Sequence, residues 1–183
     1  MNLMRLTFIM AGLLLLAGCQ SNPAKPDHHV AQVDLQRFMG DWFVIAHIPL
    51  PPEKQAWNAV ESYRLDEQGR VQVTFRFRKG AADGPLKEYT PVAYVTEDPS
   101  NAIWDMQFLW PFRADFRVVW LDDDYSVTVI GRQKRDYAWI MARQPGIDEA
   151  TYKRIVTYLA SEGYDIDGLR RVPHQWQGTP GYQ

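Results

Sequence analysis

Short runs in which apolar and polar residues alternate fill most of this chain, and they constrain its fold more than any other feature. The clearest run is 71–78, where Val71, Val73, Phe75 and Phe77 share one face and polar side chains occupy the other. Such alternation is typical of a β-strand with one dry face and one wet face.

Eight runs of this kind follow one another between residues 43 and 143, separated by turn residues and prolines. They are 43–48, 57–65, 71–78, 86–95, 102–108, 114–121, 126–131 and 137–143. Eight strands joined mostly by hairpin-length connections predict an antiparallel up-and-down meander, which closes into a β-barrel wide enough for one small ligand. A two-sheet sandwich is the structural alternative. We therefore expect an all-β fold, an eight-stranded antiparallel up-and-down β-barrel.

The alternation also predicts which side chains face the inside of such a barrel. In the run 57–65, for example, Trp57, Glu61 and Tyr63 fall on one face. The predicted lining residues are Glu61, Tyr63, Phe75, Phe77, Trp104, Met106 and Phe108. Their aromatic rings could instead fill a solid core, and a register error of one residue would exchange the two faces. Glu61 is either an inward carboxylate that orients a polar head group or acts as a base, or a salt-bridged or exposed glutamate.

Two helical segments flank the strands. Asp34 is a candidate N-cap for one or two turns that end at Gly40. A second helix is expected to begin at Asp148 and to stop at Gly163. Its apolar stripe consists of Tyr152, Ile155, Val156 and Leu159. We expect this single C-terminal helix to pack on the outside of the barrel through that stripe.

The first nineteen residues predict export and lipidation. A positively charged leader precedes eleven apolar residues, 6–16, and the segment ends in Leu16-Ala17-Gly18-Cys19. Eleven residues rise about 17 Å as a helix, which is too short to cross a bilayer, so 1–18 is expected to be a signal peptide. Leu-Ala-Gly-Cys resembles the bacterial lipobox, which implies that Cys19 carries diacylglycerol and further acyl chains.

The remaining boundaries follow from composition. Residues 19–33 read as the lipidated anchor and a tether, 34–172 as the barrel with its helix, and 173–183 as a tail. Gln20 and Ser21 follow Cys19, and the absence of Asp after it resembles lipoproteins that are passed to the outer membrane. We expect a lipid-anchored protein of the outer membrane with its domain in the periplasm.

Composition excludes several classes of site. The net charge is −2 and the basic residues are scattered among acids, so no nucleic-acid partner is expected. A single cysteine excludes an intrachain disulfide and a Cys₄ or Cys₂His₂ zinc site. The pair His28-His29 lacks a third ligand nearby, so we expect no metal and no cofactor.

Four motifs in order resemble the lipocalin family: a helical turn, Gly40-Asp41-Trp42 at the first strand, Asp123-Asp124-Tyr125 before the seventh strand, and Arg143 after the eighth. The resemblance implies that Arg143 lies across the Trp42 ring next to Gly40 and closes the barrel floor, as a structural clasp.

The segments 110–112, 135–140 and 162–165 are similar to the bacterial outer-membrane branch of that family. This implies binding of fatty acids or lysophospholipids for storage or transport in the envelope, and it admits a homodimer. The proline-rich loop 49–52, Phe75 and Trp110 depart from the family pattern at positions that bear on the cavity or its mouth.

Two other functions remain open at this stage. A hydrolase would need an activated nucleophile, but no Gly-x-Ser-x-Gly is present and the serines show no base partner, so no catalytic residue is expected. A structural envelope lipoprotein with a filled barrel would bind no ligand.

Overall fold

The computed structural model describes residues 26–175. The predicted signal peptide, Cys19 and most of the predicted tail lie outside the described residues. The strands of the described part are β1 (Gly40–Ile48), β2 (Ala56–Leu65), β3 (Arg70–Lys79), β4 (Leu86–Tyr89), β5 (Val92–Val95), β6 (Ile103–Leu109), β7 (Phe112–Leu121), β8 (Val127–Gly131), β9 (Ala138–Ala142) and β10 (Arg170–Arg171). Its helices are α1 (Leu35–Phe38) and α2 (Glu149–Ser161), with 3₁₀ turns η1 (Pro51–Glu53) and η2 (Ile166–Gly168).

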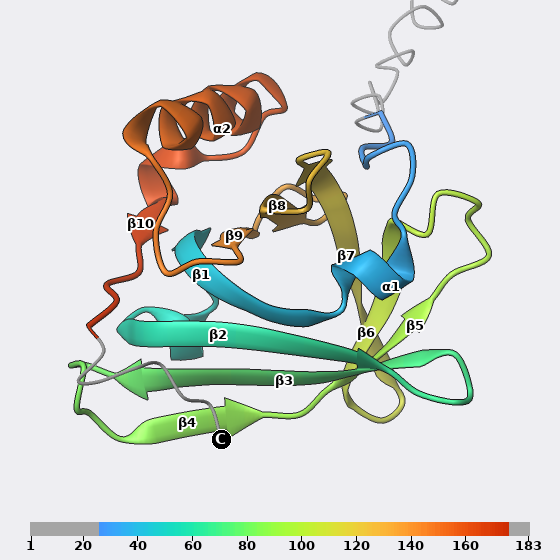
Figure 1. The fold of residues 1–183 in the computed structure, drawn as a ribbon, viewed down its shortest axis with the longest axis horizontal. Helices are drawn as coiled ribbons and strands as arrows, with labels where there is room; N and C mark the ends of the chain where they lie inside the picture. The colour runs from blue at the N-terminus through green and yellow to red at the C-terminus, as the bar shows by residue number, and fades with distance from the viewer. Residues whose placement is uncertain (1–25, 176–183) are drawn as a thin grey trace, which may run out of the picture.

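The strands form one closed antiparallel barrel (Figure 1). Each strand from β1 to β9 pairs with the next, except that β4 and β5 both pair with β3. β1 pairs with β9 to close the wall, with Val44 opposite Met141. The predicted run 86–95 is divided at Thr90-Pro91 into β4 and β5, because proline has no backbone N–H to donate to a ladder. When β4 and β5 are counted as one interrupted strand, β1 to β9 form the eight-stranded up-and-down barrel that the sequence predicts.

A β-bulge in β2 corrects one predicted face. The pairing register of β2 with β3 shifts between Trp57 and Val60, and Asn58 adopts a φ of 49°. Trp57 therefore lies opposite Arg78, on the outer face, although simple alternation placed it with Glu61. The extra residue of a bulge turns every side chain before it to the other face.

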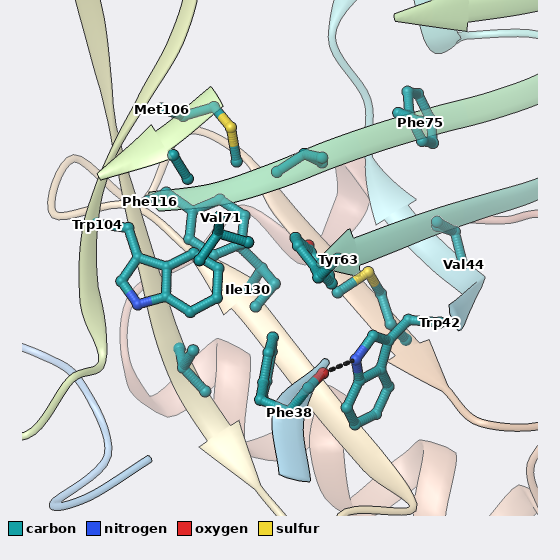
Figure 2. Close-up of a cluster of buried hydrophobic side chains, with 14 of the residues drawn as sticks. Phe38, Trp42, Val44, Tyr63, Val71, Phe75, Trp104, Met106, Phe116 and Ile130 are labelled. Carbon is teal, nitrogen blue, oxygen red and sulfur yellow. Dashed lines mark hydrogen bonds between the residues drawn. The ribbon is translucent and has the colours of Figure 1, made fainter. Parts of the chain in front are cut away.

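Buried side chains form an inner core inside the barrel and an outer core beneath α2. Figure 2 shows the inner core, where aromatic rings from α1, β2, β6 and β7 point toward one another. In the outer core, Ile155 and Leu159 of α2 are fully buried against Ile45 and Ile140 of the barrel wall. The C-terminal helix thus packs outside the barrel, as predicted (Figure 1). No helix within residues 26–175 is long and apolar enough to cross a membrane.

The described part of the expected tether, residues 26–33, lies against the barrel. Val33 is fully buried, and its N–H donates to Ser100 O at 2.7 Å. His28 is almost fully buried, with its ring near the aromatic side chains of Tyr158 and Tyr164. The sequence of this segment shows no regular spacing of apolar residues. Val33 is nevertheless buried, because the segment packs against the barrel strands.

Candidate ligand-binding cavity

A cavity of about 320 Å³ lies inside the barrel, at one end of the inner core. This volume is at the lower end of the range for small-molecule sites in proteins. Most of its wall is apolar, formed by Leu50, Pro52, Phe75, Tyr89, Pro91, Met106, Phe108, Ala114, Phe116, Tyr137 and Trp139. Its polar side chains are Glu53, Glu61, Asp115 and Arg132. An apolar wall with a few polar groups suits an elongated apolar ligand that carries one polar end.

The mouth of the cavity is the end of the barrel where β1, β3 and β6 finish, and it is bordered by η1, the turn 110–111 and the loop 132–137. Arg132 lies in that loop, and its Nη1 is 3.3 Å from Asp136 Oδ2. Asp115 accepts hydrogen bonds from the Gln133 backbone at 2.6 Å and from Arg117 at 2.8 Å. One guanidinium, that of Arg132, and two carboxylates, those of Asp115 and Asp136, therefore lie at the rim.

The opposite end of the cavity is closed by stacked aromatic rings (Figure 2). Trp104 stacks on Phe116 with ring centroids 5.1 Å apart, and Phe38 and Tyr63 meet Trp104 edge-on at 5.5 and 5.8 Å. Trp104 also donates through Nε1 to Asn101 O at 2.7 Å. These rings fill the half of the barrel next to its closed end. A ligand therefore has room only in the half next to the mouth.

Four of the seven residues predicted to line the cavity contact it: Glu61, Phe75, Met106 and Phe108. The other three, Tyr63, Phe77 and Trp104, face inward but are buried in the inner core and are not part of the cavity wall.

Further lining residues were missed from the sequence, among them Tyr89, Phe116 and Trp139. Alternation in the run 114–121 carried a usable signal for Phe116, because it places Ala114, Phe116 and Val118 on one face.

An acidic group forms one side of the cavity. Glu53 is 6% exposed, and its Oε2 accepts a hydrogen bond from Trp139 Nε1 at 2.9 Å. The same oxygen lies 3.4 Å from His47 Nδ1, and His47 is 2% exposed. Glu53 sits in η1, whose turn is closed by its backbone N–H donating to Leu50 O at 2.9 Å. The proline-rich loop thus brings a carboxylate to the cavity, which no periodic pattern predicts.

Glu61 faces the cavity from the middle of β2, beside Phe75 of β3. Burial and, to a lesser extent, the charge of Glu53 raise the pKa of its carboxyl to about 8, against a smaller lowering by the Tyr63 hydroxyl. Burial also raises the pKa of Tyr63 well above its ordinary value. At neutral pH, Glu61 is therefore mostly protonated and can donate a hydrogen bond to a ligand.

The closed end of the barrel is held by Arg143. Its Cζ lies 3.8 Å from the Trp42 ring centroid. Its two terminal nitrogens donate to the backbone carbonyls of Arg37, Phe38, Met39 and Asp41 at 2.8–3.1 Å. Gly40 has a φ of 95°, and a Cβ there would lie 3.3 Å from Arg143 Nη1. A side chain at this position would therefore crowd the guanidinium.

The motif Asp123-Asp124-Tyr125 supports the same end. The Asp34 N–H donates to Tyr125 Oη at 2.8 Å, and Arg37 lies over the Tyr125 ring at 4.0 Å. Within residues 26–175, no group of three or more His, Cys, Asp or Glu side chains is arranged to hold a metal ion. The chemistry of the cavity is accordingly that of apolar contact, the three carboxyl groups of Glu53, Glu61 and Asp115, and the guanidinium of Arg132 at the rim.

Known proteins are similar to this chain in sequence and in fold. The outer membrane lipoprotein Blc of Citrobacter freundii is 28% identical over 175 residues, which cover 94% of each chain. Temperature-induced lipocalin-1 of Arabidopsis thaliana is 30% identical over 155 residues, which cover 79% of this chain and 81% of that one. Insecticyanin of the tobacco hornworm Manduca sexta superposes with a TM-score of 0.63 at 19% identity, over 82% of this chain and 86% of that one.

The model of the lipocalin-like domain family matches residues 33–174, which include the whole barrel, α2 and every residue of the cavity wall. Lipocalins are generally binding and transport proteins. The chain belongs to the lipocalin family.

Proposed function

We propose that this protein is a membrane-anchored lipocalin that stores or transports fatty acids or lysophospholipids for maintenance of the envelope. The observation that carries the proposal is the apolar cavity of about 320 Å³ above a solid aromatic floor. Each methylene group removed from water contributes about 0.8 kcal/mol, so ten methylenes contribute about 8 kcal/mol before the costs of association. An acyl chain is the ligand class that uses such a wall best.

The polar groups of the cavity favour one orientation of the lipid. A fatty acid that entered head-first would bring its carboxylate toward the carboxylate of Glu53, and like charges repel. With the tail inside, the anionic head group lies at the open mouth, in contact with water and beside Arg132, whose charge Asp136 partly neutralises. We therefore place the acyl tail against Phe75, Met106 and Phe116 and the head group at the rim.

The anchor forms the second half of the proposal. Cys19 lies outside the described residues, and the lipobox-like Leu-Ala-Gly-Cys remains its only support within the chain. Relatives with this length and domain are named outer membrane lipoproteins in Citrobacter freundii and Escherichia coli. We infer that Cys19 is lipidated and that the barrel is held at the outer membrane on its periplasmic side. A Cys19→Ser chain should leave the membrane fraction, and unchanged sedimentation with membranes would refute the anchor.

Binding is favoured over catalysis by the side chains at hand. None of the described residues that line the cavity is Ser, Thr, Cys or Lys, so the wall offers none of the usual nucleophiles for acyl transfer. We expect no sustained hydrolysis of lysophospholipids or esters. Product formation that is abolished by Glu61→Gln would show that the carboxyl acts as a base.

Native mass spectrometry tests the proposal. The mature chain with Cys19→Ser, purified from a bacterial host, is titrated with a lysophospholipid, and we expect one lipid per chain. Phe75→Asp places a charge on the cavity wall and should weaken binding at least tenfold, whereas Ile166→Asp, outside the barrel, should leave it unchanged. Circular dichroism checks the fold.

If Phe75→Asp does not fold, Ala114→Trp serves instead, because it fills the cavity without adding a charge. A folded wild-type barrel that takes up neither lysophospholipid nor fatty acid would refute the proposal and favour a structural role.

A further inference from the structure

Most of the large apolar side chains that the described residues leave exposed gather at one place. The full set is Leu86, Tyr89, Phe108, Leu109, Trp110, Phe112 and Ile166. All except Ile166 lie on β4 or on the hairpin of β6 and β7, near the mouth of the cavity. Scattered exposed apolar residues need no explanation, but a cluster of this kind marks an interaction surface.

The most exposed members form the tip of the β6–β7 hairpin, which consists of Phe108, Leu109, Trp110 and Phe112. Their side chains are 58%, 70%, 81% and 72% exposed. Leu109 pairs with Phe112 across the turn, so these side chains are held on one short, hydrogen-bonded hairpin rather than on a long loop. A rigid turn that presents tryptophan and other apolar side chains matches the chemistry of the membrane interface, where amphipathic aromatic rings are enriched.

The tip is continuous with the cavity. Phe108 belongs both to the tip and to the cavity wall, and Tyr89 of β4 lines the cavity as well. The ladder between β5 and β6 ends where Val92 lies opposite Gln107, and β4 pairs with β3. Phe108 and Leu109 therefore extend past that ladder and border the mouth. Apolar surface thus runs from the outside of the tip into the cavity.

The chain that precedes the barrel is long enough to bring the tip to the membrane that would hold Cys19. Asp27 forms an ion pair with Arg117 of β7, which fixes the start of the described chain on the barrel wall. Trp110 lies seven residues from Arg117, at most about 24 Å along a strand and less along the tilted barrel axis. Cys19 lies eight residues from Asp27, a reach of up to about 28 Å when extended.

We propose that the tip inserts into the interface of a lipid bilayer and thereby sets the cavity mouth against the membrane. An acyl chain then passes between bilayer and cavity along apolar surface without crossing water. Transfer of an acyl chain through this contact rests on the proposed lipid binding. Insertion of the tip into the bilayer does not depend on it.

Vesicle sedimentation tests the insertion. The mature chain with Cys19→Ser, which removes the covalent anchor, is mixed with vesicles of phosphatidylethanolamine and phosphatidylglycerol. We expect binding that falls at least tenfold in the double variant Leu109→Ser, Trp110→Ser. The control Ile166→Ser removes an exposed apolar side chain that does not belong to the hairpin tip and should bind as the parent does. Equal binding of the tip variant and the parent, with both folded, would overturn the proposal.

Two further measurements separate the remaining outcomes. Analytical ultracentrifugation shows whether the tip instead joins two copies of this chain: a dimer that the tip variant abolishes, with no vesicle binding by the parent, would overturn membrane insertion.

Binding of a fluorescent fatty acid in solution, below its micelle concentration, tests the cavity alone. The tip variant should retain this binding but exchange lipid with vesicles at least tenfold more slowly. If solution binding fails while vesicle binding persists, the proposed function falls and the insertion stands.

Discussion

Replacing Glu61 with glutamine should stabilise the protein, and increasingly so as the pH rises. The folded chain holds the Glu61 proton up to a pKa of about 8, whereas an unfolded chain releases it near 4.5. Since the folded state then binds more protons between these values, the free energy of unfolding falls as the pH rises from 4.5 to 8. Glutamine keeps the shape of the side chain and removes this loss.

The magnitude follows from the same values. Each pKa unit corresponds to about 1.4 kcal/mol, so the carboxyl lowers the free energy of unfolding by about 3 kcal/mol at pH 7. Glu61 faces the cavity, where water screens its charge, which makes about 3 kcal/mol an upper bound. Cavity water does not alter the sign, because the cost arises from burying the ionised form and from its repulsion by Glu53.

Urea denaturation of wild type and Glu61→Gln at pH 5 and pH 8 measures the effect. We expect the stability advantage of the variant to grow by about 2 to 3 kcal/mol between the two pH values. Glu97→Gln, at an exposed position, is the matched control and should show no such growth. An advantage that is the same at both pH values would mean that Glu61 is solvated and ionised in the folded chain, and the reasoning would be wrong.

Three further substitutions test other parts of the structure by chemical or thermal denaturation. Arg143→Met should lower the free energy of unfolding by about 3 kcal/mol, because it removes the charged donor from four backbone carbonyls and from the Trp42 ring. A decrease of less than 1 kcal/mol would show that the clasp contributes little. Asp148→Ala should cost about 1 kcal/mol, since the Asp148 carboxylate accepts from Thr151 N at 2.9 Å, and retention of the cap by Asp148→Asn would support this cause. Val33→Ala should cost about 2 kcal/mol because the side chain is fully buried, and no change would mean that residues 26–33 unfold separately from the barrel.

Alternation along the strands predicted the barrel and the inward faces of β3 and β6 because it depends only on local backbone geometry. It could not predict the height of each inward residue along the barrel axis, which depends on the offset between strands. Tyr63 and Trp104 therefore face inward as expected but lie in the floor, below the cavity. Trp57 was misplaced because a bulge at Asn58 breaks the alternation.

The polar side of the cavity was largely beyond sequence reasoning. Glu53 reaches the wall from a turn that follows the strand of His47, and its other partner, Trp139, comes from a strand 86 residues away in sequence. Glu61 was recognised as an inward candidate, but its raised pKa depends on burial and on Glu53, which only the folded chain brings near.

Photo-crosslinking would show whether an acyl chain occupies the cavity. A fatty acid with a diazirine near the end of its chain is bound to the mature Cys19→Ser protein, irradiated and located by peptide mass spectrometry. We expect labels on Phe75, Met106 and Phe116, and their loss when unlabelled lysophospholipid competes. Labels confined to the outside of the barrel, or labels that no lipid displaces, would contradict this expectation.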